Sequence, residues 1–223
     1  MNIPSITIGA GHGANGLGSA VQVLLLITLI TLAPSLVIML TAFTRIIVVL
    51  GFVRSAIGIP QTPPNQVLTG LAIFLTFFIM TPTMNTINNT ALQPLMANKI
   101  SQGEALNRAQ VPIRAFMFKQ VRESDLSLMV YAAREARPRT QADVPTLVLI
   151  PAFILSELHT AFQIGFMIFL PFLIIDIVVS SALMAMGMMM LPPTTISLPF
   201  KLLLFVMVDG WHLVVQSLIL GFH

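Results

Sequence analysis

The stretch from residue 147 to residue 191 reads LVLIPAFILSELHTAFQIGFMIFLPFLIIDIVVSSALMAMGMMML, and it decides the fold. It is almost continuously apolar, whereas a helix that crosses the hydrocarbon core of a bilayer needs only about 20 apolar residues. The stretch is therefore too long for one span, and it predicts a kinked pair of helices. The interruptions within it are Pro151, Glu157, His159, Gln163, Pro171 and Asp176.

The composition of the chain of 223 residues is that of a membrane protein. Hydrophobic residues make up 56% of it and charged residues only 9%, against about 25% charged residues in an ordinary soluble domain. Because the chain has no cysteine, it forms neither disulfides nor thiolate metal sites. The formal charge of +3 comes from eleven Lys and Arg against eight Asp and Glu, mostly in one region, so we discount nucleic acid as a partner.

The first 80 residues divide into a polar tail and three apolar blocks, within what we take as one structural unit overall. Residues 1–20 are Gly-rich and polar; they predict a flexible tail and show no signal peptide, although removal of one from a longer precursor stays open. Residues 21–80 form the first hairpin region, and its last two blocks are short for a span, so we expect buried or re-entrant helices there. The blocks are Val21–Met39, which Pro34 kinks, Ile46–Val53 and Val67–Met80.

Residues 81–145 form the polar, water-facing part of the chain, with eight of the basic residues and five of the acidic ones. Helical spacing predicts two amphipathic helices there, one beginning after Pro112 and one beginning after Ser124 as its N-cap. Residues 146–223 are again apolar and predict helical hairpins. Their last block, Leu202 to Leu220, is broken at Asp209 and Gly210.

Six ionisable side chains lie in the apolar segments, where each costs about 2.5–3.5 kcal/mol on insertion scales and needs a partner or a wet cavity. They are Glu157, Asp176, Asp209, Arg45, Arg54 and Lys201. Three acids and three bases could neutralise one another as ion pairs that hold helices or subunits in register. A proton or ion relay is the second interpretation.

The segment MAMGMMMLPP, residues 184–193, is here named the Met loop. The midpoint between Asp176 and Lys201 falls inside it, so a hairpin that places these two residues opposite each other, in one copy or between copies, has its tip there. Methionine is flexible and polarizable, and three in a row cannot share one packed helix face. We therefore expect a deformable seal rather than ordinary core packing. Its residues are Met186, Met188, Met189 and Met190, and the turn-forming residues are Gly187, Pro192 and Pro193.

No pattern typical of an enzyme occurs in the chain. The GAGHG segment lacks the strand and helix of a dinucleotide site, and the four histidines show no zinc-binding spacing. We expect no catalytic residues, no cofactor and no metal.

Several long, ordered tracts resemble the FliP family of flagellar type III secretion export-gate proteins, whose injectisome counterpart is SctR. They are TPPNQVL (62–68), DIVVSS (176–181), MGMMMLPP (186–193) and SLPFKLLLFVMVDGW (197–211). The resemblance covers nearly everything from Met39 onward and implies an all-α membrane protein. Its kinked hairpins would assemble into a helical, cone-shaped gate with several subunits.

The resemblance also implies partners, a location and residue roles. The partners would be further copies in a homopentamer, FliQ and FliR in the pore, FlhB and FlhA of the export apparatus, and unfolded flagellar export substrates. The location would be the flagellar basal body in the bacterial inner membrane, with residues 81–145 periplasmic. The Met loop would seal the closed pore, and Glu157, Asp176 and Lys201 would make contacts between subunits; Phe116 and Arg122 are further positions of interest.

Three functions are compatible with these observations. The first is a passive, gated protein-conducting pore, since the chain combines a deformable Met loop with no catalytic or nucleotide motif. The second is an ion or proton transporter that uses Glu157 and Asp176 as a relay. The third is a structural scaffold, in which the Met loop lies away from any passage.

Overall fold

The computed structural model describes residues 38–59, 61–134, 138–188 and 190–222, together with residues 21, 23, 24, 26–28, 31 and 32. Residues 1–39 and residues 40–223 form separate compact units. The residues described between 21 and 32 are helical. The expected tail (1–20) and the expected kink at Pro34 lie outside the described residues, so both stay predictions.

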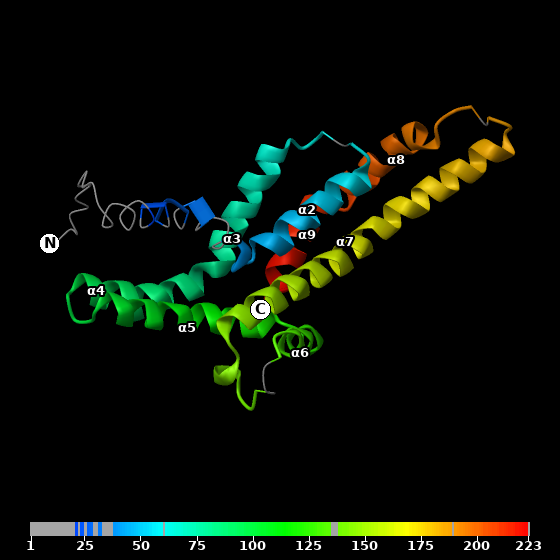
Figure 1. Ribbon diagram of the computed structural model, residues 1–223. Helices are drawn as coiled ribbons and strands as arrows, with labels where there is room; N and C mark the ends of the chain where they lie inside the picture. Colours follow the sequence, from blue (N-terminus) through cyan, green and yellow to red (C-terminus); the bar gives the residue numbers. More distant parts are fainter. Residues whose placement is uncertain are drawn as a thin grey trace. The chain divides into compact units, whose positions relative to one another are not determined.

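The second unit consists of helices joined by short connections (Figure 1). The described residues contain no strand, and the predicted all-α class is confirmed. The elements are α2 (Phe43–Ile57), α3 (Asn65–Ile87), the π-helix η1 (Asn88–Leu92), α4 (Gln93–Met96), α5 (Gln102–Gln120), α6 (Glu123–Ala132), the 3₁₀ turn η2 (Gln141–Asp143), α7 (Thr146–Ala185), α8 (Pro193–Met207) and α9 (Gly210–Leu220).

The helix α7 is one continuous element of 40 residues, so the predicted kinked pair is wrong. Pro151 and Pro171 both lie inside it. Each proline removes one helical hydrogen bond, but a backbone in an apolar setting satisfies its other polar groups only by remaining helical. At 1.5 Å per residue α7 is about 60 Å long, roughly twice the thickness of a hydrocarbon core.

The helix α3 is also longer than predicted. It continues through η1 and α4, and residues Asn65–Met96 are long and apolar enough to cross a membrane, so the expectation of a short helix over Val67–Met80 is wrong. The hydroxyl groups of Thr81, Thr86 and Thr90 donate hydrogen bonds to carbonyls four residues earlier, at 2.7–3.0 Å. These hydroxyl groups therefore have their hydrogen-bond partner within the helix itself where it continues beyond the apolar block.

Two described helices, α3 with its continuation and α7, meet the length and composition of a membrane span. The pair α8 and α9 makes a third if it counts as one span, bent by 60°. The bend lies at Asp209, which has a positive φ of 50° and precedes Gly210, the first residue of α9. The predicted break in the last apolar block is therefore confirmed.

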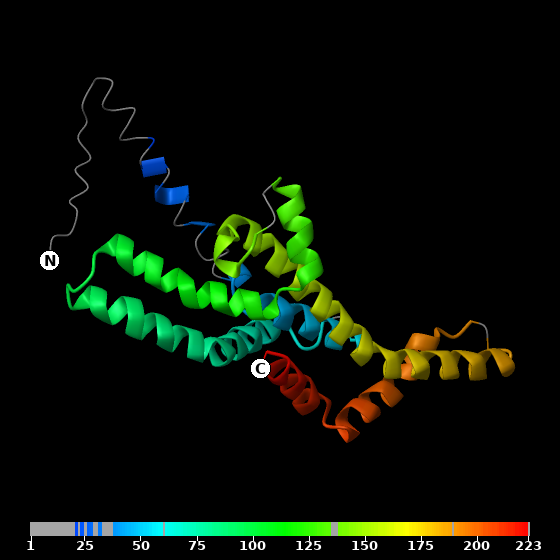
Figure 2. The same ribbon diagram turned by 90° about the horizontal axis from the view of Figure 1, so that it is seen from below.

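The polar region folds as predicted into two helices, but both begin elsewhere. Ser101 caps α5 by accepting a hydrogen bond from the backbone N–H of Glu104 at 3.3 Å, and Pro112 lies inside the helix. The N-cap position of α6 is Arg122, not Ser124. The helix α5 returns beside η1 and α4, and Figures 1 and 2 both show this hairpin.

The core of the second unit is built around α2, which contacts α3 and α7. Ile46, Val49, Leu50 and Val53 are all completely buried. Full burial of each such side chain stabilises the fold by about 1.5–3 kcal/mol. The short block that contains them is a buried helix, which is one of the two expected outcomes.

Candidate functional site

The Met loop joins α7 to α8 at the end of a hairpin (Figure 2). The helix α7 ends in a Schellman motif, in which the N–H of Met188 donates to the carbonyl of Leu183 at 3.0 Å and the N–H of Gly187 to that of Met184 at 3.1 Å. Gly187 has a φ of +74°, which favours glycine. Pro193 then begins α8 at a position where its missing N–H costs no hydrogen bond.

The described methionines of the Met loop are exposed within the single chain. The exposed fractions are 62% for Met184, 61% for Met186, 46% for Met188 and 98% for Met190. Met189 lies outside the described residues. The chain therefore offers apolar, flexible side chains at the hairpin end that its own fold does not cover.

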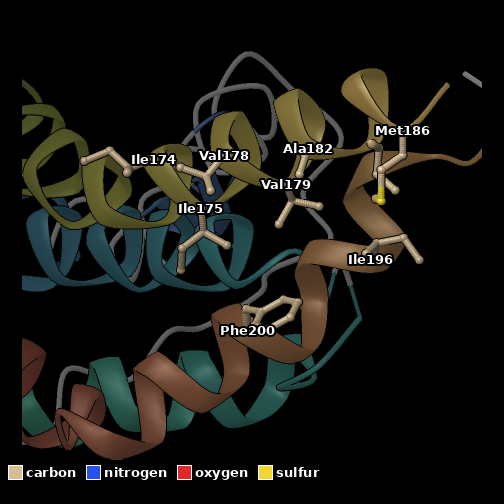
Figure 3. A pocket seen from close by; sticks show the side chains of 9 residues that line it. Ile174, Ile175, Val178, Val179, Ala182, Met186, Ile196 and Phe200 are labelled. Atoms are coloured by element: carbon tan, nitrogen blue, oxygen red, sulfur yellow. The ribbon is translucent and has the colours of Figure 1, made fainter. Parts of the chain in front are cut away.

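An apolar cleft of about 430 Å³ lies between α7 and α8, next to the Met loop. Figure 3 shows side chains from both helices facing the cleft, with Met186 of the Met loop at one end of it. Its lining residues are Ile174, Ile175, Val178, Val179, Ala182, Leu183, Met186, Ile196 and Phe200. All nine side chains are apolar, so the cleft suits hydrocarbon and offers no hydrogen bonds.

Asp176 and Lys201 form an ion pair within one chain, between α7 and α8. The Lys201 Nζ lies 2.6 Å from Asp176 Oδ2, and the Ser197 hydroxyl donates to Asp176 Oδ1 at 2.6 Å. Lys201 and Ser197 are buried, and the Asp176 side chain is 25% exposed. Both carboxylate oxygens thus have a partner, and the pair sets which residues of the two helices face each other. The sequence argument placed Asp176 opposite Lys201 but missed Ser197, which lies one helical turn before Lys201.

Arg45 and Glu157 form a second, fully buried pair between α2 and α7. The Arg45 Nη2 lies 2.5 Å from Glu157 Oε1, and Arg45 Nε donates to Glu157 Oε2 at 2.9 Å. Two parallel bonds of this kind give a guanidinium–carboxylate pair a fixed geometry. The pair therefore locks α7 against the central helix α2.

The Arg45 guanidinium also holds the end of α5 and the segment after α9. It donates to the Gln120 side chain at 2.9 Å and to the Gly221 carbonyl at 2.8 Å, and it lies 3.8 Å from the centre of the Phe222 ring. Gln120 in turn donates to the Phe222 carbonyl at 3.4 Å. Sequence reasoning missed Gln120, Gly221 and Phe222, because no local pattern marks partners 75 or 176 positions from Arg45.

Arg54 and Asp209 do not form the third ion pair that a mutual neutralisation of the six charges requires. The Arg54 guanidinium donates to the Asn65 side chain at the start of α3. Asp209 is exposed and makes no ion pair with a residue that the structure describes. Asp209 lies at the break between α8 and α9, where the single chain leaves its side chain uncovered. The structure does not pair these two residues with each other within the chain, and a pairing between copies stays a prediction.

Phe116 and Arg122 lie near the Arg45 cluster but differ in role. Phe116 is buried and packs against Phe153 and Phe222, with ring centres 5.9 and 6.2 Å apart. Arg122 is exposed, and its backbone N–H donates to the Ser156 hydroxyl at 2.9 Å. This hydroxyl donates to Asp125 at 2.7 Å, which ties α6 to α7.

The start of α7 is held by the polar region. Arg114 of α5 donates to the Thr146 hydroxyl at 2.6 Å and to the Val144 carbonyl at 2.7 Å. Hydrogen bonds from the backbone N–H and the hydroxyl of Thr140 hold the pKa of the Asp143 carboxyl below its ordinary value. The start of α7 is therefore anchored by polar contacts.

These features define a class: an all-helical membrane protein whose longest helix carries buried ion pairs and ends in an exposed, methionine-rich loop. Residues 26–218 match the FliP family. The chain is 55% identical to the flagellar biosynthetic protein FliP of Bacillus subtilis (strain 168), over 97% of this chain and 98% of that protein. The chain belongs to the FliP family, and it is a membrane-embedded protein of flagellar biosynthesis.

Two further relatives have the same name. The flagellar biosynthetic protein FliP of Pectobacterium carotovorum subsp. carotovorum is 51% identical, over 95% of this chain and 82% of its own length. That of Borreliella burgdorferi is 49% identical, over 100% of this chain and 88% of its own length.

Proposed function

We propose that this chain is a subunit of the gate through which flagellar proteins are exported, and that its Met loop seals the closed pore. The observation that carries the proposal is the Met loop itself. Its described methionines are exposed in the single chain, yet they are apolar and lie at the end of a hairpin. Such side chains need an apolar partner, and the same loop of a neighbouring copy is the partner of matching chemistry.

The ion pair between Asp176 and Lys201 supports the loop mechanically. It joins α7 to α8 below the loop, and Ser197 fixes the second oxygen of the carboxylate. A buried pair of this kind sets the register of two helices more than it adds to stability. A fixed register places the Met loop at the same position in every copy of the chain. Loops from neighbouring copies can meet in a ring only if their positions match in this way.

The assembly that we propose consists of several copies of this chain, a homopentamer, with FliQ and FliR as further pore subunits. FlhB and FlhA would be its neighbours in the export apparatus, and unfolded flagellar proteins would be its cargo. The location would be the flagellar basal body in the inner membrane, with residues 81–145 on the periplasmic side. Family membership supports this assembly, and so does the amount of apolar surface on α3 and α7 that the single chain leaves exposed.

The decisive experiment measures leakage through the closed complex. Replacing Met188, Met189 and Met190 by alanine shortens the side chains and opens gaps that they fill. We expect membrane vesicles from cells that produce the triple variant to leak small ions faster than wild-type vesicles. A matched control is Met167→Ala, which shortens an exposed methionine in the middle of α7. Equal leakage from wild type, triple variant and control would refute the seal.

An ion relay through Glu157 and Asp176 has less support from the geometry. Both oxygens of each carboxylate already bind side chains, those of Arg45 for Glu157 and those of Lys201 and Ser197 for Asp176. A relay carboxylate needs an oxygen that is open to an incoming proton donor, and this pairing occupies both oxygens of each group. Proton flux into vesicles that is lost in Asp176→Asn while the complex still assembles would favour the relay instead.

A further inference from the structure

The Met loop leaves its thioether sulfurs open to oxidants. Its methionines are exposed, and oxidants reach an exposed sulfur far more readily than a buried one. The most exposed of them, Met190, has 98% of its surface free, and Met186 and Met188 have about half or more. Under the proposed function, neighbouring loops cover one side of these side chains and the other side borders the passage, where a small oxidant in the aqueous channel reaches the sulfurs.

We propose that Met186, Met188 and Met190 are an oxidation site at which peroxide or hypochlorous acid converts methionine to methionine sulfoxide and thereby opens the seal. With hydrogen peroxide, a sulfur lone pair attacks one oxygen, an S–O bond forms and the O–O bond breaks. The proton of the attacked hydroxyl passes to the departing hydroxide, so that one water leaves. The sulfur is oxidised by two electrons and the peroxide is reduced.

The sulfoxide changes the loop chemically as well as sterically. Its S=O group is a strong hydrogen-bond acceptor, and an acceptor without a donor is unfavourable in an apolar seal. Met186 also lines the cleft between α7 and α8, where all other lining residues are apolar and offer no donor. We therefore expect the oxidised Met186 side chain to turn out of the cleft. This inference rests on the proposed function, because oxidation of the loop can be detected as leakage only if the loop seals a passage.

Methionines outside the Met loop serve as internal controls when the oxidation of each residue is measured. Met80 and Met117 are each only 1% exposed and should stay unmodified. Met96 lies outside the loop, in α4, and is 81% exposed. It reports the dose of oxidant that reaches exposed sulfur in general. The three classes separate modification of the loop from unfolding, because unfolding would also oxidise Met80 and Met117.

The experiment treats membrane vesicles that contain the full assembled chain with increasing hydrogen peroxide, and it follows both ion leakage and the oxidation of each methionine by mass spectrometry. We expect the loop methionines to oxidise at doses that spare Met80 and Met117, with leakage rising by about tenfold. The matched variant M186L/M188L/M190L keeps apolar side chains of similar size but cannot form sulfoxides. We expect it to be closed before treatment and to lose most of the oxidant-induced leak. Methionine sulfoxide reductases with a dithiol, which becomes a disulfide as the oxygen leaves as water, should restore the seal in wild type.

Two results would overturn the inference while leaving the seal intact. One is a loop that stays unoxidised when Met96 is fully oxidised. The other is an oxidant-induced leak of equal size in the leucine variant and in wild type. If the alanine variants of the loop do not leak at all, the proposed function itself fails, and that outcome is visible without any oxidant.

Discussion

Removing the carboxylate of Asp176 tests the energetics of the hairpin most directly. In Asp176→Ala the buried ammonium of Lys201 loses its ion-pair partner, and the Ser197 hydroxyl loses its acceptor. Breaking a buried pair by removing one partner costs about 3–5 kcal/mol. Because a quarter of the Asp176 side chain is exposed, solvent compensates part of this loss. We therefore expect the lower end, about 3 kcal/mol.

That loss corresponds to a decrease in Tm of about 6–12 °C for a chain of this size. The assay is thermal unfolding of the purified chain in detergent micelles, followed by far-ultraviolet circular dichroism. The double variant D176A/K201M removes both charges and keeps an apolar side chain of similar length, so it should unfold at a higher temperature than D176A alone. Ser197→Ala is the matched control and should cost only about 1 kcal/mol. A Tm of D176A equal to that of wild type, or a double variant as unstable as the sum of the singles, would refute the reasoning.

Three further outcomes are expected. Gly187→Ala should lower the free energy of unfolding by about 1–2 kcal/mol, because an L residue is strained at a φ of +74° although no atom lies near the added methyl group. The control Gly70→Ala, at a position where φ is not positive, should not destabilise the chain. Equal effects at both positions would contradict this reasoning. Gly165→Ala should destabilise the contact of α7 with α2, because the new methyl group overlaps the Phe52 ring. In the Phe52→Ala background, which lacks the overlapping ring atoms, Gly165→Ala should lower the Tm much less, and an equal loss in both backgrounds would refute the cause. The pKa of the Asp143 carboxyl lies below its ordinary value of 3.8 in the folded chain, so the capping box of Thr140 and Asp143 should persist above pH 3.8 and open only as the pH falls through the lower, folded pKa. Hydrogen exchange at the Thr140 amide measures this opening. An identical pH profile in Asp143→Asn would argue against it.

Local patterns predicted the hairpin well. A tight turn forces positions at equal distances on either side to face each other, so the midpoint of Asp176 and Lys201 located the turn. Gly187 and the prolines after Met190 marked where α7 ends and α8 begins. The break at Asp209 and Gly210 was equally visible, since a charged residue next to a glycine interrupts an apolar block.

Two kinds of feature escaped sequence reasoning. The first is the continuity of helices through Pro82, Pro151 and Pro171, where the apolar surroundings keep the backbone helical although the local rule for proline ends a helix. The second is the cluster around Arg45, whose partners come from α5, α7 and the segment after α9. The sequence near Arg45 does not indicate Gln120 or Gly221 as its partners, because only the tertiary fold brings these residues together.

The length of α7 has a consequence for the life of the protein in the cell. A rod of about 60 Å fits a hydrocarbon core of about 30 Å only at a tilt near 60°, beyond the usual range for membrane helices. Part of its apolar surface therefore lies outside lipid and needs cover, which α2, α5, α6 and α8 of the same chain supply only in part. If the chain assembles as proposed, a copy made in excess over its neighbours would expose that surface to proteases and chaperones, and balanced production of the subunits would follow from the geometry of one helix.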